Sequence, residues 1–209
     1  MELSDEGLQL ILDGEVGGGR KFYEKRCRRP IVSDPAGAHG GITIGIGCDL
    51  GQMDRSRFIG EWGGYLTSDQ LDRLEKACGL RDEAALQYLP KVRDINVGWE
   101  AALMHFQAYS VPRFMTLVEK AFPGICAAPA CVREGLLSLV FNRGTSMRGG
   151  RRREMREILY MVASGKFAEI PGKIREMKRL WPDSPGLQKR REAEARHIEE
   201  GLKSISSQL

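Results

Sequence analysis

A glycine-rich apolar segment interrupts a chain whose hydrophobic residues otherwise recur mainly at helical spacing. Residues 40–51 read GGITIGIGCDLG, and the β-branched side chains between the glycines favour a short strand at 42–46. Two further β-type pairs precede it, at 22–23 and 31–32, separated by turns that contain proline. Such runs, bounded by glycine and proline, indicate a small antiparallel sheet with tight turns. We therefore expect a β lobe at about residues 20–51.

The rest of the chain has the pattern of helices. The first helix begins at Ser4 or Asp5, carries apolar residues through Val16 and ends before the glycines at 17–19. Further helices are expected at 67–79, 81–89, 132–141, 152–163, 167–180 and 186–204, and at 96–121 in two segments broken near Pro112. The sequence therefore predicts an α+β, mostly helical protein of one domain (1–209). Residues 1–19 and 66–209 form its helical lobe.

Charge and cysteine content exclude several classes of protein. The 32 Lys and Arg residues against 28 Asp and Glu residues give a net charge of +4, too small by itself to indicate a nucleic-acid partner. The five cysteines form no CxxC pair, and their odd number leaves a thiol over, so the fold is not expected to depend on disulfides. Cys126 and Cys131 are close enough in sequence to pair in an oxidising compartment, and that pairing stays open.

Neither a metal nor a membrane is indicated. The three histidines are scattered and no HExxH motif occurs, so we expect no metal and no cofactor. The acidic N-terminus lacks the apolar region of a signal peptide, and no apolar run approaches the ~18 residues of a membrane span.

Acidic residues near the glycine-rich segment fit the chemistry of glycosidic bond hydrolysis, which needs two carboxylates held apart. Glu15, at the end of the first helix, is the candidate general acid, and Asp49 is the candidate base that activates a water molecule. Thr43 lies between them and offers a hydroxyl to orient that water, so we favour inversion. Each residue also has an ordinary interpretation: an exposed helix end, a turn residue and a strand residue.

Three sequence blocks resemble the phage-type lysozymes. Glu15, Tyr23 and residues 41–47 (GITIGIG) are similar to that family's helix-borne glutamate, tyrosine and Thr-Ile-Gly-x-Gly strand. Residues 136–144 (LLSLVFNRG) resemble its buried helix ending in Phe-Asn-x-Gly, and 186–195 (GLQKRREAEA) resemble its C-terminal Gly-Leu-x-x-Arg-Arg-x-x-Glu helix. The blocks occur in the family's order, and the resemblance implies a lysozyme-like fold.

The Asp49-Leu50-Gly51 continuation is most similar to the pesticin-like muramidases and related cell-wall-degrading toxin domains. In these, the strand threonine and an aspartate six residues later act with the helix glutamate, and Thr43 and Asp49 have that spacing. The resemblance implies a catalytic set of Glu15, Thr43 and Asp49 that hydrolyses the β-1,4 bond between N-acetylmuramic acid and N-acetylglucosamine. The commonest phage pattern instead places the aspartate before the threonine, so Glu24 and Asp34 stay alternative bases.

Several other residues are candidates for substrate binding. Tyr23 is available to stack on a sugar face, and Asn142 and Arg143, at the end of a buried helix, are candidates to line the glycan cleft. Core packing for the tyrosine and helix capping for the asparagine are the alternatives. An arginine cluster at 148–156 is interpreted as a solvated helix start, and we expect no nucleic-acid partner.

The expected partner is the glycan strand of peptidoglycan, bound by a monomer. Without a signal peptide, the chain is expected to be made in the cytoplasm and to reach the periplasmic cell wall after holin release or dedicated secretion. A phage endolysin, a bacteriocin domain and a secretion-system effector all fit, and in the toxin cases a cognate immunity protein is expected. A module that keeps the lysozyme fold but only binds glycan is the alternative to an enzyme.

Overall fold

The computed structural model describes residues 3–32 and 40–207, and most of them are helical. Contacts divide the chain into two units, here called the β unit (15–111) and the helical unit (1–14 with 112–209). The boundaries fall within helix α1 (Asp5–Val16) and at the start of α7 (Val111–Ala121). Within the two described ranges, no helix combines the length and apolar character needed to cross a bilayer.

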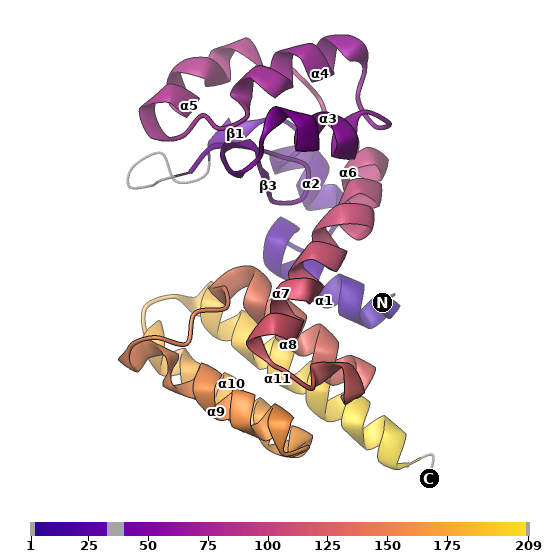
Figure 1. Cartoon of the computed structure of the whole chain (residues 1–209). Helices are drawn as coiled ribbons and strands as arrows, with labels where there is room; N and C mark the ends of the chain where they lie inside the picture. The colour runs from indigo at the N-terminus through magenta and orange to yellow at the C-terminus, as the bar shows by residue number, and fades with distance from the viewer. Residues whose placement is uncertain (1–2, 33–39, 208–209) are drawn as a thin grey trace. The chain divides into compact units, whose positions relative to one another are not determined.

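The predicted antiparallel sheet is present in the β unit and is small. Its three strands, β1 (Ile31–Val32), β2 (Ile42–Ile44) and β3 (Cys48–Asp49), lie in the order β1-β2-β3 and are all antiparallel. Ile31 pairs with Thr43 across the first ladder, and Thr43 pairs with Asp49 across the second. The helices around the sheet are α2 (Arg20–Arg26), α3 (Arg55–Trp62), α4 (Ser68–Leu74), α5 (Asp82–Tyr88) and α6 (Trp99–His105) (Figure 1).

Three local predictions for the β unit were wrong or incomplete. The pair 22–23 is not a strand: it lies in α2, whose exposed side carries an Arg20–Glu24 ion pair of 2.8 Å. Helix α3 was not predicted; Asp54 caps it by accepting a hydrogen bond of 2.8 Å from the backbone N–H of Arg57. The break expected near Pro112 is instead a π-helical turn, Phe106–Ser110, which continues α6 into α7.

The strand predicted through Ile46 stops at Ile44 because Gly45 has a φ of +57° and starts a turn. A Cβ atom at Gly45 would also lie 2.8 Å from Cη2 of Trp62, which is fully buried. Gly45→Ala is therefore expected to lower the free energy of unfolding by more than the ~1–2 kcal/mol that a left-handed backbone costs an L-residue. Urea denaturation followed by circular dichroism measures the change.

Gly60 offers a matched control for this substitution. It lies in α3, is exposed, and a Cβ atom there would meet nothing within 4 Å. Alanine is the better helix former by about 1 kcal/mol, so Gly60→Ala should stabilise the protein where Gly45→Ala destabilises it. Equal effects of the two substitutions would contradict the role given to Gly45.

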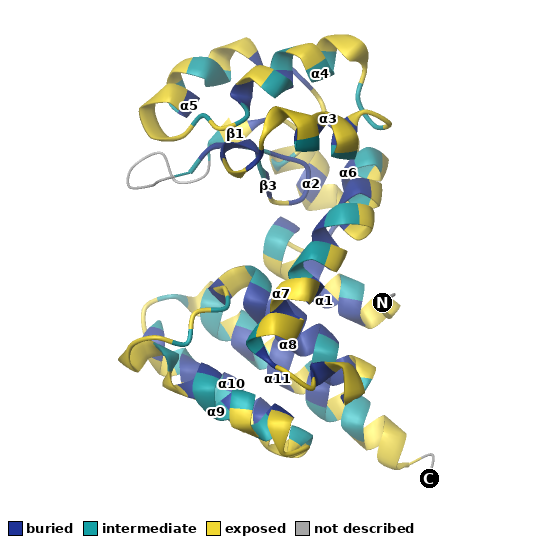
Figure 2. Ribbon diagram, viewed as in Figure 1, coloured by how far each residue is buried: buried dark blue, intermediate teal, exposed yellow. Residues whose placement is uncertain are grey.

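The helical unit is built around two long helices that lie side by side, α8 (Ala130–Arg143) and α11 (Pro185–Ser206) (Figure 1). Their backbones come close because Gly135 has no side chain: a Cβ atom there would lie 2.6 Å from Ile198. Helix α10 (Ile170–Glu176) packs on α11, and α9 (Arg153–Ala163) packs on α10. Most of α8 is buried, as predicted for this apolar segment (Figure 2).

Charged groups are buried between α8 and α11. The Glu194 side chain is fully buried and accepts hydrogen bonds from Ser138 (2.8 Å) and Arg191 (2.6 Å). Burial raises the pKa of this carboxyl, while the facing arginines Arg191 and Arg190 oppose that rise. At the other end of the helix pair, Glu134 accepts a hydrogen bond of 2.7 Å from the backbone N–H of Ser4, at the start of α1. These contacts fix α8, α11 and the beginning of α1 as one packed group.

All five cysteines are free. Cys126 is exposed, with its thiol 3.4 Å from a carboxylate oxygen of Glu119, whereas Cys131 is buried against Gly201 on α11. The pairing left open between these two residues is therefore not made. The structure therefore contains no disulfide among these five cysteines, all of which lie in the described part of the chain.

Candidate active site

The β2–β3 hairpin presents a polar face and an apolar face. Thr43 and Asp49 are directly paired residues of the antiparallel ladder, so their side chains lie on the same side of the hairpin. Both are half-buried, whereas the alternating residues Ile42, Ile44 and Cys48 are buried. The alternation brings the two predicted catalytic side chains together on the accessible face.

Hydrogen bonds hold the Asp49 carboxylate in place. Its Oδ1 accepts from the backbone N–H groups of Gly51 (2.8 Å) and Gly41 (3.1 Å), and its Oδ2 accepts from the side-chain amide of Gln52 (2.9 Å). A Cβ atom at Gly41 would lie 2.4 Å from Oδ1, so only glycine lets the backbone reach the carboxylate. Asp49 therefore is the turn residue that the sequence offered as its alternative interpretation. The same hydrogen bonds fix the orientation of its carboxylate.

Glu15 reaches the turn of the same hairpin. It lies in the last turn of α1, as predicted, and is half-buried. Gly17, Gly18 and Gly19 follow, each with a positive φ, and end the helix there. One carboxylate oxygen of Glu15 is 3.7 Å from the position that a Cβ atom at Gly47 would occupy. Since Gly47 belongs to the turn that joins β2 to β3, the glutamate lies next to the segment that carries Thr43 and Asp49.

Tyr23 does not lie on this accessible face. Its side chain is fully buried, its hydroxyl donates a hydrogen bond of 2.9 Å to the carbonyl of Val97, and its ring meets Trp99 edge-on at 5.4 Å. Burial raises the pKa of the hydroxyl well above its usual range. The structure corrects the substrate-contact prediction: Tyr23 is a core residue that fixes α2 against α6, the packing alternative.

Of the two alternative bases, Glu24 and Asp34, the structure describes only Glu24. Glu24 is exposed on α2 and pairs with Arg20, which also pairs with Glu100 at 2.8 Å. This arrangement is that of a surface ion pair on a helix, not of a carboxylate beside a glycine-lined hairpin. Asp34 lies outside the described residues.

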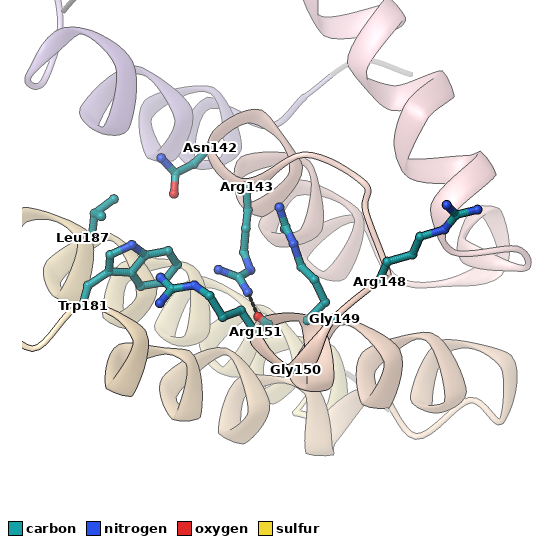
Figure 3. A pocket seen from close by; sticks show the side chains of 9 residues that line it. Asn142, Arg143, Arg148, Gly149, Gly150, Arg151, Trp181 and Leu187 are labelled. Atoms are coloured by element: carbon teal, nitrogen blue, oxygen red, sulfur yellow. Dashed lines mark hydrogen bonds between the residues drawn. The ribbon is translucent and has the colours of Figure 1, made fainter. Parts of the chain in front are cut away.

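Asn142 and Arg143 lie in the helical unit, at the end of α8, and line a cavity of about 610 Å³ (Figure 3). Arg143 is buried, donates a hydrogen bond to the carbonyl of Arg151 and lies 4.9 Å over the ring of Trp181. Burial, together with the neighbouring positive charges of Arg152 and Arg191, lowers the pKa of Arg143 to about 10. Asn142 is exposed, and α8 ends with Gly144 at a φ of +69°.

Some contacts at the hairpin and at the cavity beside α8 were not predicted from the sequence. Gln52, which orients Asp49, has a signal in the sequence because it stands three residues after an aspartate at a turn. The contact of Trp181 with Arg143 has no local signal, because the two residues come from distant segments. Residues 3–32 and 40–207 bring together no group of three or more His, Cys, Asp or Glu side chains that could hold a metal ion.

Comparison of the sequence with models of known protein families gives no match, and comparison with curated protein sequences gives none either.

Proposed function

We propose that this protein is a peptidoglycan hydrolase with a lysozyme-like fold, which cleaves the β-1,4 bond between N-acetylmuramic acid and N-acetylglucosamine. The observation that carries the proposal is the hairpin: Thr43 and Asp49 share its accessible face, and Glu15 lies against its turn. These are the residues that the resemblance to pesticin-like muramidases selected. The helical character with a small antiparallel sheet is consistent with such a fold.

In this mechanism Glu15 protonates the leaving glycosidic oxygen. Asp49 accepts the proton of an attacking water molecule, and the Thr43 hydroxyl holds that water on the opposite face of the sugar. The backbone donors on Oδ1 keep the Asp49 carboxylate from turning away, which preserves its orientation through the reaction. A water molecule between two carboxyl groups requires a separation of about 6.5–9.5 Å and inverts the anomeric centre.

The test is digestion of isolated peptidoglycan by the purified full chain. We expect new reducing ends, and after borohydride reduction the modified sugar should be muramic acid, since a muramidase leaves that residue at the new end. Appearance of reduced glucosamine instead would contradict the bond assignment. Sedimentation of folded protein with the polymer without any new reducing ends would support the glycan-binding module instead.

The biological setting is part of the same proposal. The chain acts on the periplasmic cell wall after release by a holin or by a dedicated secretion machine, as an endolysin or as an antibacterial toxin. In a toxin, an immunity protein of the producing cell would have to block the face that carries Thr43 and Asp49.

A further inference from the structure

The cavity in the helical unit is lined by positive charge. Four arginines, Arg143, Arg148, Arg151 and Arg152, contribute to its wall, and its lining contains no acidic side chain among the described residues. Four like charges around one cavity repel one another, and this repulsion grows as the groups lose contact with water. The repulsion is strongest at Arg143, which is buried, and weaker at Arg148 and Arg151, which are exposed; a bound anion would relieve it.

These arginines are not compensated by carboxylates within the protein. In the described part of the chain, no ion pair joins any of the four to an acidic residue; Arg143 and Arg151 instead donate to the backbone carbonyls of Arg151 and Leu180. The neighbouring Arg153 behaves differently, because it pairs with Glu154, Glu157 and Glu176. Within this continuous stretch, Arg153 lies outside the cavity lining and pairs with glutamates, whereas Arg151 and Arg152 line the cavity and have no carboxylate partner among the described residues.

Buried donors in the cavity wall have no partner. Arg143 is only 9% exposed, and its Nε has no hydrogen-bond acceptor among the described residues; the same holds for one terminal nitrogen of Arg152. The acidic residue that acts electrostatically on Arg143 is Glu154; its Oε1 is bound by Arg179 and Arg153, and no hydrogen bond or ion pair joins it to Arg143 in the described part of the chain. A buried guanidinium without enough acceptors costs free energy, and an oxyanion would supply the missing ones.

The cavity wall combines arginine side chains, an indole ring and a glycine turn. Figure 3 shows the guanidinium groups of Arg143 and Arg151 gathered beside the Trp181 ring, while that of Arg148 is directed away from them. Arg191, fully buried, lies 5.8 Å over the same ring, but its charge is paired with the Glu194 carboxylate at 2.6 Å. At the rim, a Cβ atom at Gly149 or Gly150 would meet nothing within 4 Å, so this turn leaves space for a ligand.

We propose that this cavity is a binding site for a compact polyanion whose carboxylate or phosphate groups are held by Arg151 and Arg152, with Arg143 beneath them. The planar fork of arginine matches both kinds of oxyanion in bidentate fashion. A volume of about 610 Å³ admits a small molecule or a short acidic group, not a nucleic-acid duplex. All the residues that line the cavity belong to the helical unit, whereas Glu15, Thr43 and Asp49 belong to the β unit.

Isothermal titration calorimetry on the full chain at low ionic strength tests this site. The probes are citrate, which carries carboxylates, and inorganic pyrophosphate, which carries phosphates; the one that binds more tightly assigns the ligand class. Arg151→Gln and Arg152→Gln should each weaken binding about tenfold, the usual effect of losing one charge-assisted contact. Both substitutions are at positions that are not fully buried, so the fold should persist, and thermal unfolding checks that it does.

Arg153→Gln is the matched control. It removes one positive charge from the same turn of chain but from a side chain that already pairs with glutamates. Its effect on binding should stay within about twofold, because the charge of Arg153 is already compensated by these glutamates. Absence of binding of both probes, or equal weakening by Arg151→Gln, Arg152→Gln and Arg153→Gln, would overturn the proposal.

Discussion

Glu15→Gln is expected to lower the rate of glycan cleavage by about 10²–10⁴-fold, the contribution that a positioned general acid usually makes. Glutamine has nearly the shape of glutamate and still forms hydrogen bonds, but it carries no acidic proton to give to the leaving oxygen. The residue is half-buried at the end of α1, so the substitution should leave the fold intact. Release of reducing ends measures the rate, and the midpoint of thermal unfolding measures the fold.

Two carboxylate controls distinguish Glu15 from its surroundings. Asp13 is exposed on the same helix, two residues earlier, where it accepts a hydrogen bond of 2.6 Å from Gln9. Glu24 is exposed on the next helix and pairs with Arg20. Asp13→Asn and Glu24→Gln should retain normal activity. Full activity in Glu15→Gln would contradict the proposed acid, and loss of activity in Asp13→Asn would show that charge on α1 matters more than proton donation.

The hairpin could be predicted because its signals are local. Glycines in residues 40–51 mark positions that need a left-handed backbone or a close approach, and the structure uses Gly45 for both purposes. Pairing of Thr43 with Asp49 follows once that turn is placed between the strands. The predicted strand end at Ile46 lies two residues beyond the observed end at Ile44, because β-branched Ile46 has strand propensity but follows a glycine that has already turned the chain.

Short helices were harder to predict because their stability comes from contacts across the fold. Helix α2 has only seven residues, and its Phe22-Tyr23 pair was interpreted as a strand; burial of Tyr23 against Val97 and Trp99 determines the helical outcome. Helix α3 has a local start signal in Asp54, but Gly60 lies in its interior, and glycine lowers helix propensity. Tertiary packing overrode the local preference in both cases.

The residues of the candidate active site could be predicted from the sequence, whereas the arginine cavity could not. Glu15, Thr43 and Asp49 come from two nearby segments, and a spacing pattern is enough to select them. The arginine cavity combines the end of α8, the turn before α9 and Trp181 before α11. From the sequence alone, the arginine cluster at 148–156 was interpreted as a solvated helix start. Only the packed structure shows that Arg153 pairs with glutamates, whereas Arg151 and Arg152 form no ion pair with an acidic residue in the described part of the chain.

Asp49→Asn is the second substitution with a large expected effect, a loss of about 10²–10⁴-fold in cleavage rate if Asp49 is the general base. This substitution tests catalysis only if the hairpin stays folded. The amide oxygen of asparagine can still accept from the backbone N–H groups of Gly41 and Gly51, and Gln52 can rotate to offer its own oxygen to the new amide group. The midpoint of thermal unfolding of Asp49→Asn should therefore stay close to that of the unchanged protein.

Asp49→Ala separates the structural role of this residue from its catalytic one. Alanine removes the acceptor altogether and leaves two partly buried backbone donors unpaired, which costs about 1–3 kcal/mol of unfolding free energy. Both substitutions should abolish cleavage, but only Asp49→Ala should unfold at lower urea concentration. Near-normal lysis by folded Asp49→Asn would leave Asp49 with its turn role alone and would move the base to Asp34 or Glu24. Because Glu24 is exposed and bound to Arg20, Asp34→Asn is then the deciding substitution.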